Sequence, residues 1–177
     1  MGVSLIKNDL LLFSKEDQSI IDWAIDSTGL NDLRTREVDF LSGGQFQRAW
    51  IAMALAQDTP IIFLDEPTTY LDLTNQLDIL KLLKQLNETS KKTIIMVLHD
   101  LNHASRFSHY LIAMKDGQII KTGSSNEVMT TDTLKKVFNI NATLTTCPYS
   151  HNPICLTYDS FEEESFQRNS EVVSIGS

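Results

Sequence analysis

The sequence lacks the features that mark several large classes of protein. Its two cysteines, Cys147 and Cys155, have neither C-x-x-C spacing nor a matching pair of histidines, so packing thiols are expected rather than a disulfide or a metal centre. No apolar run approaches the ~18 residues that a bilayer span needs, and no signal peptide opens the chain. Any membrane role is therefore expected to run through partner proteins.

Positive charge is also scarce. Against 23 Asp and Glu the chain has 15 Lys and Arg, which leaves a net charge of −8. A nucleic-acid backbone requires a basic face, so nucleic acid is not expected as the main partner. The hydrophobic fraction of 42% is ordinary for a globular protein, and 177 residues are enough for one domain with a core.

The first hundred residues alternate between helical and strand patterns. Ser14, with Asp17 three residues later, predicts a capped helix over 14–28. The short apolar runs "PIIFLDEP" and "TIIMVLHD" are bounded by turn residues. They predict parallel strands buried on both faces, rather than strands with one solvent-exposed face. The remaining predicted helices cover residues 45–56, 73–86 and 101–108. This alternation predicts an α/β fold with a parallel sheet.

The rest of the chain is less regular. Residues 109–123 predict a hairpin with Asp116–Gly117 as its turn, and residues 124–138 predict a capped segment followed by a short helix. The pattern weakens from Asn139 onward. The last stretch, "SFEEESFQRNSEVVSIGS", is acidic and rich in serine, which is typical of a frayed tail.

One glycine motif has the chemistry of a phosphate site. In "LSGGQ", Ser42, Gly43 and Gly44 directly precede the helix predicted to begin at Gln45. Adjacent glycines let the backbone approach a ligand, and a hydroxyl and amide groups at a helix N-terminus suit an anion. Taken alone, however, a Ser-Gly-Gly turn before a helix is more often only a cap.

Two carboxylates and a histidine follow the two predicted strands. Asp65 and Glu66 end the first strand, and the ends of parallel strands are where ligands bind in such sheets. In nucleotide triphosphatases such a pair holds Mg²⁺ and polarises the attacking water. His99 ends the second strand, so it is expected near both carboxylates, although a lone histidine there is more often structural.

The order of these motifs resembles the nucleotide-binding subunits of ABC transporters. "LSGGQ" is similar to the family's signature motif, "IIFLDEP" to its Walker B strand, "YLD" (Tyr70–Asp72) to its D-loop and "VLHD" to its switch-histidine loop. The resemblance covers roughly residues 13–155, and residues 1–12 match nothing. The sequence around Trp50 and Tyr70 resembles that of ATPases of importers for iron–siderophore, haem or cobalamin compounds.

The resemblance implies a P-loop NTPase (ABC ATPase) fold, of which only the C-terminal part is expected. It implies one incomplete domain over 1–177, with part of the helical subdomain in 1–45, the core in 46–138 and an extension and tail in 139–177. It also implies ATP and Mg²⁺ as cofactors, and partners in a second ATPase subunit and membrane permease subunits. The expected location is the cytoplasmic face of the membrane, as a peripheral protein.

The same resemblance implies a role for each motif residue. Asp65 is expected to coordinate Mg²⁺ through water, Glu66 to act as general base and His99 to contact the γ-phosphate. Ser42, Gly43, Gly44 and Gln45 are expected to bind the ATP held by the opposite subunit, and Asp72 to communicate across the dimer.

The sequence departs from the family at the phosphate-gripping loop. None of its 7 glycines is followed by Lys and then Ser or Thr, so no G-x-x-x-x-G-K-[ST] is present. The family's Q-loop glutamine and adenine platform have no candidate either. The chain alone is therefore expected to hydrolyse ATP negligibly, and an unpaired sheet edge and exposed apolar surface are expected.

Three functions stay open at this point. The first is the C-terminal part of an importer ATPase. The second is a non-catalytic module that supplies a signature motif to a full-length ATPase or docks a permease. The third is a non-transport member of the superfamily, such as a repair or translation factor, which the acidic balance and the importer-like wording disfavour.

Overall fold

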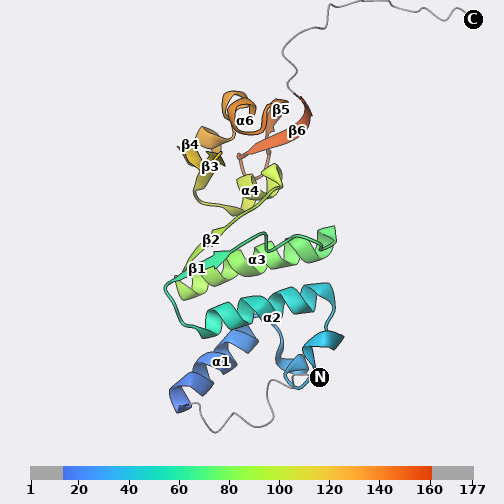
Figure 1. The fold of residues 1–177 in the computed structure, drawn as a ribbon, viewed down its shortest axis with the longest axis vertical. Coiled ribbons are helices and arrows are strands. Elements are labelled where there is room, and N and C mark those ends of the chain that lie inside the picture. The colour runs from blue at the N-terminus through green and yellow to red at the C-terminus, as the bar shows by residue number, and fades with distance from the viewer. Residues whose placement is uncertain (1–13, 161–177) are drawn as a thin grey trace, which may run out of the picture. The chain divides into compact units, whose positions relative to one another are not determined.

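The computed structural model describes residues 14–160 in two compact units, Met1–Asp100 and Leu101–Ser177, which are considered separately (Figure 1). Two regions singled out in the sequence, residues 1–12 and the acidic tail after Ser160, lie outside the described residues. Within the described part, no helix combines the length and the apolar character needed to cross a membrane.

The first unit contains five longer elements of the predicted alternation, together with two 3-10 turns. Its helices and strands are α1 (Lys15–Ser27), the 3-10 turns η2 (Asn31–Leu33) and η3 (Val38–Phe40), α2 (Gly43–Ala56), β1 (Ile61–Leu64), α3 (Leu73–Ser90) and β2 (Thr93–Met96). β1 and β2 pair in parallel, with Leu64 opposite Met96. The α/β prediction with a parallel sheet is thus confirmed in this unit.

Local capping sets where the helices begin. Ser14 caps α1 in a capping box with Asp17, as predicted, and Ser42 caps α2 in a second capping box with Gln45. In such a box each residue satisfies an amide of the other, so the first turn is fixed by the sequence itself. Consequently α2 begins at Gly43, two residues before the predicted start, and the two glycines lie within its first turn.

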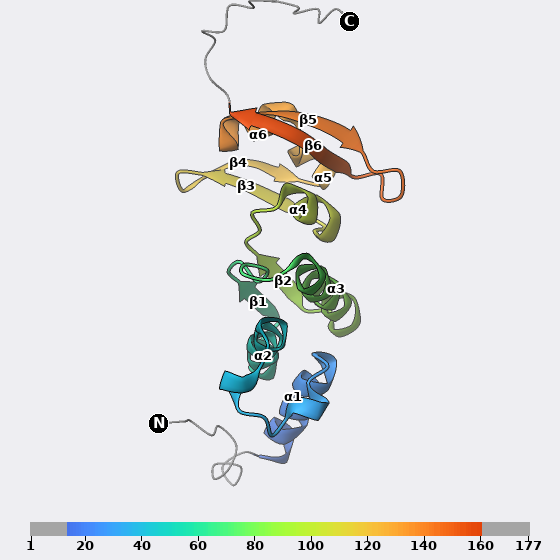
Figure 2. The ribbon, with the colours of Figure 1, turned by 90° about the vertical axis from the view of Figure 1, so that its right-hand side faces the viewer.

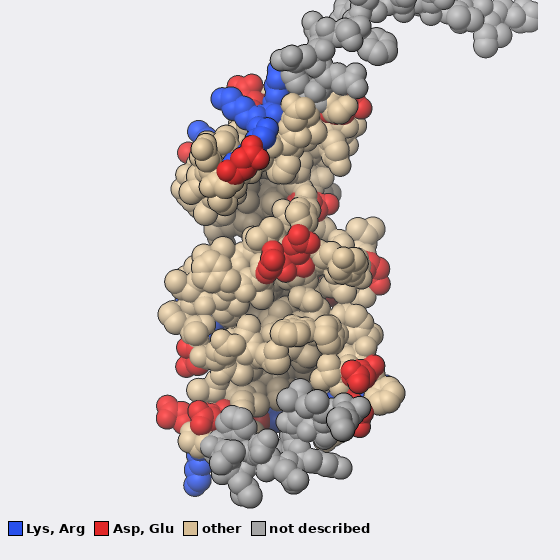
Figure 3. All heavy atoms as spheres, in the orientation of Figure 1, with Lys and Arg blue, Asp and Glu red and all other residues tan. Residues whose placement is uncertain are grey.

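The core of the first unit lies between its helices and one face of the β1–β2 pair. Figures 1 and 2 show α1 beside α2 and the strand pair beside α3. The core consists of Ala24, Ile51, Leu55, Ile62, Ile79, Leu82, Leu83 and Leu86. On the side of the unit shown in Figure 3, uncharged side chains cover most of the surface and acidic ones form small separate groups.

The strands are not buried on both faces, which corrects the sequence prediction. Ile62 is buried, whereas its neighbour Phe63 is 73% exposed and Ile61 is 46% exposed. On β2, Ile95 is likewise exposed while Ile94 and Met96 pack against the core. The helices of this unit cover one face of the pair, so alternate side chains of each strand meet the core and the others meet solvent.

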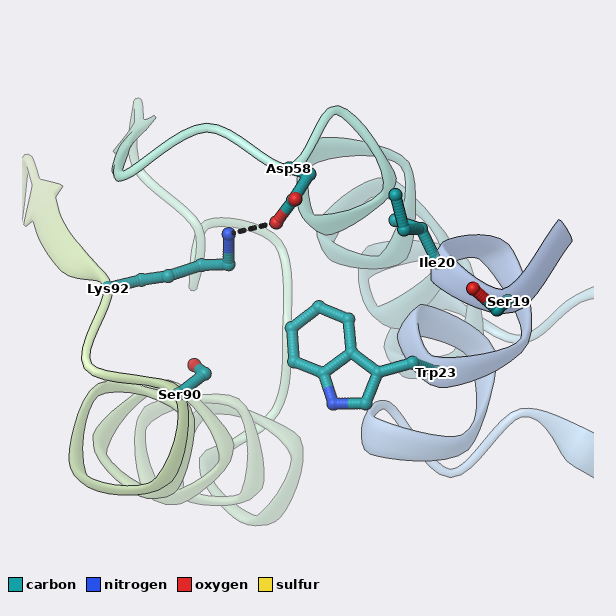
Figure 4. A pocket seen from close by; sticks show the side chains of 6 residues that line it. All are labelled: Ser19, Ile20, Trp23, Asp58, Ser90 and Lys92. Atoms are coloured by element: carbon teal, nitrogen blue, oxygen red, sulfur yellow. Dashed lines mark hydrogen bonds and ion pairs between the residues drawn. The ribbon is translucent and has the colours of Figure 1, made fainter. Parts of the chain in front are cut away.

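A buried lysine joins the end of α2 to the start of β2. The Lys92 ammonium group donates to Asp58 Oδ1 at 2.8 Å and to the Thr59 carbonyl at 2.9 Å. It also lies 5.8 Å from the centre of the Trp23 ring. Lys92, Asp58 and Trp23 line an open depression together with Ser19, Ile20 and Ser90 (Figure 4). The Lys92 contacts tie three segments of the first unit together.

The second unit is built on two antiparallel hairpins. Its elements are α4 (Leu101–Phe107), β3 (Leu111–Lys115), β4 (Gln118–Gly123), α5 (Ser125–Val128), α6 (Thr131–Phe138), β5 (Ile140–Thr146) and β6 (Pro153–Ser160). The predicted hairpin turns at Asp116 and Gly117, both with positive φ, as a type I′ turn requires. Figure 2 shows the hairpins one above the other, and α6 contacts both.

The β5–β6 hairpin was missed by the sequence analysis, in which the pattern weakens after Asn139. Its pairing shifts register between Thr143 and Leu144, and a bulge of this kind interrupts the two-residue period that marks a strand. Both cysteines lie here and neither forms a disulfide: Cys155 is buried and Cys147 is partly exposed. This agrees with the expected packing thiol for Cys155.

Candidate functional site

The residues after β1 and β2 form the most distinctive polar contact of the first unit. Because the strands run in parallel and Leu64 lies opposite Met96, both chains leave the sheet at the same edge. The Val97 amide still bonds the Leu64 carbonyl at 3.0 Å. Beyond it, His99 Nε2 lies 2.5 Å from Glu66 Oε1. The predicted closeness of His99 and the carboxylate pair is therefore observed for Glu66, although β2 ends three residues before His99.

Thr69 forms a hydrogen bond to the other oxygen of the Glu66 carboxylate. Its hydroxyl donates to Glu66 Oε2 at 2.9 Å, and its amide bonds the Glu66 carbonyl at 3.1 Å. Glu66 itself adopts φ of +47°, a region costly for a residue with a side chain. Sequence reasoning missed Thr69, whose only signal is its place three residues after Glu66.

Hydrogen bonding favours the ionised form of Glu66. The bond to His99, followed by the bond from Thr69, lowers the pKa of the Glu66 carboxyl below its ordinary value. Both bonds are made to carboxylate oxygens, and bonding to the charged form lowers an acid's pKa. The two bonds thus orient the Glu66 carboxylate at the sheet edge and favour its charged form. The Glu66 side chain is 39% exposed there and the His99 side chain 71% exposed.

Asp65 is exposed at the same edge. Within residues 14–160 no group of three or more His, Cys, Asp or Glu side chains could hold a metal ion. A single carboxylate does suit Mg²⁺ when phosphate oxygens and water complete its coordination, because this ion keeps several waters and often takes one or two carboxylates. The donor set at Asp65 therefore fits Mg²⁺ brought with a nucleotide, and does not form a complete protein cage.

The signature motif forms the first turn of α2. Ser42 Oγ accepts the Gln45 amide at 3.3 Å, and Gln45 Oε1 accepts the Ser42 amide at 3.0 Å. The first turn of a helix leaves amides without intrahelical acceptors, and those of Gly43 and Gly44 belong to this turn. Since a hydroxyl that accepts one bond keeps its proton to donate, Ser42 can cap the helix and donate to an anion.

Asp72 caps α3. One residue, Asn75, contacts both Asp72 and the signature motif. The Asp72 carboxylate accepts the Asn75 amide at 2.8 Å and the Asn75 side-chain Nδ2 at 2.9 Å. These bonds, the backbone one first, lower the pKa of Asp72. The Asn75 carboxamide in turn lies against Gly44. Sequence reasoning did not single out Asn75.

Known proteins resemble the chain in sequence. Residues 3–69 match the model of the ABC transporter family. The match includes residues 3–12, for which the sequence motifs indicate no resemblance to the family. The iron(3+)-hydroxamate import ATP-binding protein FhuC of Bacillus subtilis (strain 168) is 57% identical over 149 residues, 84% of this chain and 55% of that protein. The ferric enterobactin transport ATP-binding protein FepC of Escherichia coli (strain K12) is 43% identical over 79% of this chain and 52% of that protein.

Solved structures agree in fold. The structure of cbiO1 from Clostridium perfringens, part of the ABC transporter complex cbiONQ, matches with a TM-score of 0.62 and 30% identity. The match covers 72% of this chain and 52% of that one. This chain thus spans about half the length of the curated relatives it matches, and its fold is that of ABC ATPase domains.

Proposed function

Because this chain is related to the ATP-binding proteins of ABC importers, we propose that it forms the signature, Walker B, D-loop and switch-histidine portion of an importer ATPase. The proposed whole protein hydrolyses ATP to drive uptake of an iron–siderophore complex, a cargo class suggested by the names of its relatives. The observation that carries the proposal is the 2.5 Å contact between His99 and Glu66 beyond β1 and β2.

Glu66 is the proposed general base. It would accept a proton from the water that attacks the γ-phosphate, and its lowered pKa keeps it ionised for this purpose. A carboxylate whose pKa is lowered is also a weaker base. We therefore infer that His99 leaves Glu66 for the γ-phosphate when nucleotide binds, which raises the proton affinity of Glu66 at the point of attack.

Asp65 is the proposed Mg²⁺ residue, acting through a bound water. Asp65 would hold the ion, which would supply neutralisation of the charge that develops on the nucleotide phosphates. Asp65 is exposed at the edge where Glu66 and His99 meet, which leaves its carboxylate accessible to hydrated Mg²⁺.

Ser42, Gly43, Gly44 and Gln45 are proposed to complete the ATP site of an opposite subunit, with Asp72 communicating across the dimer. The reciprocal bonds between Ser42 and Gln45 fix the first turn of α2 before any nucleotide arrives. A preorganised helix N-terminus favours an anion such as the γ-phosphate.

The proposed partners are a second ATPase subunit and the permease subunits of the importer, with membrane contact made only through them at the cytoplasmic face. Importer ATP-binding proteins among the relatives, and a solved relative that is part of a transporter complex, support this assembly. The net charge of −8 gives no support to a nucleic-acid partner.

The sequence contains no G-x-x-x-x-G-K-[ST], so we propose that these 177 residues alone do not turn over ATP. The alternative is a non-catalytic module that lends its signature motif to a full-length ATPase or docks a permease. Stable co-purification with a full-length ATPase subunit, without ATP turnover of its own, would favour this alternative.

The first test is Mg-ATP binding to the purified chain by calorimetry, with circular dichroism on the same sample to verify folding. A folded chain without detectable binding is expected, because the amides and lysine that grip the phosphates are missing. Tight Mg-dependent binding would overturn the claim that this chain lacks a phosphate-binding element of its own.

The second test places the chain in a complete subunit. A hybrid in which this chain replaces the matching part of the Bacillus subtilis relative, 57% identical over 149 residues, should hydrolyse ATP. Glu66→Gln should abolish turnover, whereas Glu88→Gln, an exposed carboxylate on α3, should leave it unchanged. A folded hybrid that retains full turnover with Glu66→Gln would exclude Glu66 as the base.

A further inference from the structure

Asn75 holds both oxygens of the Asp72 carboxylate. Its backbone amide donates to Oδ1 at 2.8 Å and its Nδ2 donates to Oδ2 at 2.9 Å. A side chain that caps a helix usually bonds one or two backbone amides. Here the second bond comes from a side chain, which fixes the orientation of the Asn75 carboxamide relative to Asp72.

The other end of that carboxamide lies against the signature motif. A Cβ atom built on Gly44 would lie 2.4 Å from Asn75 Oδ1 and 3.0 Å from its Cγ. Gly44 has helical backbone and is buried, so no left-handed φ requires glycine there. The requirement is space, since a Cβ atom at position 44 would force the Asn75 carboxamide to shift away from its observed position.

The neighbouring glycine provides a contrast. A Cβ atom on Gly43 would lie 3.5 Å from Leu71 Cδ2, which is an ordinary van der Waals contact. Both glycines are in the first turn of α2, yet only at Gly44 does the Asn75 side chain occupy the space that a Cβ atom would need. The close approach is thus specific to one residue pair, and is not a general property of this turn.

We propose that Asn75 is a positioning residue that couples Asp72 to Gly44 in the signature motif. One carboxamide bonds the Asp72 carboxylate through its nitrogen and packs on Gly44 through its oxygen, so a displacement of Asp72 is transmitted to the first turn of α2. This inference rests on the proposed function, in which Asp72 senses the opposite subunit and the signature motif binds that subunit's ATP.

A double-mutant cycle tests the contact on the full chain. Gly44→Ala should lower the folding equilibrium constant by about 2- to 10-fold, the range expected for one weakened hydrogen bond, because the Asn75 carboxamide must shift and weaken its bond to Asp72. In an Asn75→Ala background the same change should be neutral or favourable, because alanine is the better helix former. Gly43→Ala, the matched control, should be neutral or favourable in both backgrounds. An equal loss from Gly44→Ala in both backgrounds would overturn the contact.

A spectroscopic measurement tests the coupling and does not depend on Gly44→Ala folding. Asp72→Asn should shift the Gly44 amide resonance in the otherwise unchanged chain, and should shift it less than a third as far in Asn75→Ala. Gln85 is an exposed residue on the same helix. In a Gln85→Ala background, Asp72→Asn should shift the Gly44 resonance as far as it does in the otherwise unchanged chain. A Gly44 response of equal size with and without the Asn75 side chain would refute the coupling.

Neither measurement uses nucleotide. A hybrid subunit that fails to hydrolyse ATP would therefore contradict the proposed function and leave this coupling standing. Additive mutations and an unchanged Gly44 response would instead remove the coupling and leave the proposed ATPase role intact.

Discussion

His99 Nε2 and Glu66 Oε1 lie 2.5 Å apart although 33 residues separate them in sequence. The contact exists because β1 and β2 pair in parallel and end at the same edge. It brings the proposed base and the proposed γ-phosphate sensor into direct contact. Under the proposed function, His99 and the attacking water would both bond the Glu66 carboxylate and would therefore compete for it.

Glu66→Gln should stop turnover and not binding in the hybrid subunit. The amide keeps the size of the side chain but cannot accept the proton, and general-base catalysis contributes about 10²- to 10⁴-fold. We expect at least a ~100-fold fall in kcat with ATP retained and the dimer prolonged. Single-turnover kinetics with labelled ATP and size-exclusion chromatography measure both, and release of ATP at the parental rate would argue against trapping.

The titration of Glu66 should depend on its two partners. His99→Ala should raise the Glu66 pKa towards its ordinary value, and Thr69→Val should raise it less, since the His99 bond is the larger cause. Carboxyl ¹³C NMR titration of the folded chain measures this, with Thr68→Val as control. An unchanged Glu66 pKa in His99→Ala would mean that the bond is absent in solution.

The sign of the linked stability follows from the same shift. Because the folded pKa of Glu66 lies below the unfolded one, its contribution is complete above the unfolded pKa and is lost as pH falls through the folded pKa. Chemical denaturation of the chain should therefore show a smaller pH dependence in His99→Ala on the acid side of the ordinary glutamate range. Both side chains are partly exposed, so the difference should be small.

Ser14→Ala and Ser42→Ala should cost similar stability and differ in function. Each serine caps a helix in a capping box, and loss of such a cap costs about 1 kcal/mol. Only Ser42 belongs to the signature motif, so only Ser42→Ala should reduce ATP turnover of the hybrid beyond its effect on folding. Equal turnover in the two variants would count against the signature role.

Lys92→Met should destabilise the first unit by about 1–3 kcal/mol, since hydrogen bonds to charged groups contribute about this much. The change keeps the aliphatic packing near Trp23 and removes the bonds to Asp58 and the Thr59 carbonyl. Urea unfolding followed by Trp fluorescence measures it. Lys81→Met, at an exposed position on α3, should change stability by less than about 0.5 kcal/mol.

Features with local causes could be predicted from the sequence. The Ser14–Asp17 capping box and the Asp116–Gly117 turn are encoded within four residues, and both are observed. The contact of His99 with Glu66 was also predictable, because strand order alone brings two strand ends together. Its detail was not: the bond from Thr69 depends on the left-handed backbone of Glu66.

Other features depend on tertiary packing, which no short sequence pattern encodes. The apolar runs of β1 and β2 indicated burial on both faces, but Phe63 and Ile95 are exposed because the helices of the first unit cover one face. The Asn75 contact with Gly44 joins two helices that are distant in sequence. The β5–β6 hairpin was missed because a bulge interrupts its alternation.

The two cysteines make the second unit a natural place for a probe. Cys155 is buried in β6, whereas Cys147 is partly exposed before the turn of the hairpin. Hydrogen bonding from Ser150 lowers the pKa of the Cys147 thiol, which favours the reactive thiolate. A maleimide dye should therefore label the folded chain at Cys147 without mutagenesis and leave the buried Cys155 unlabelled.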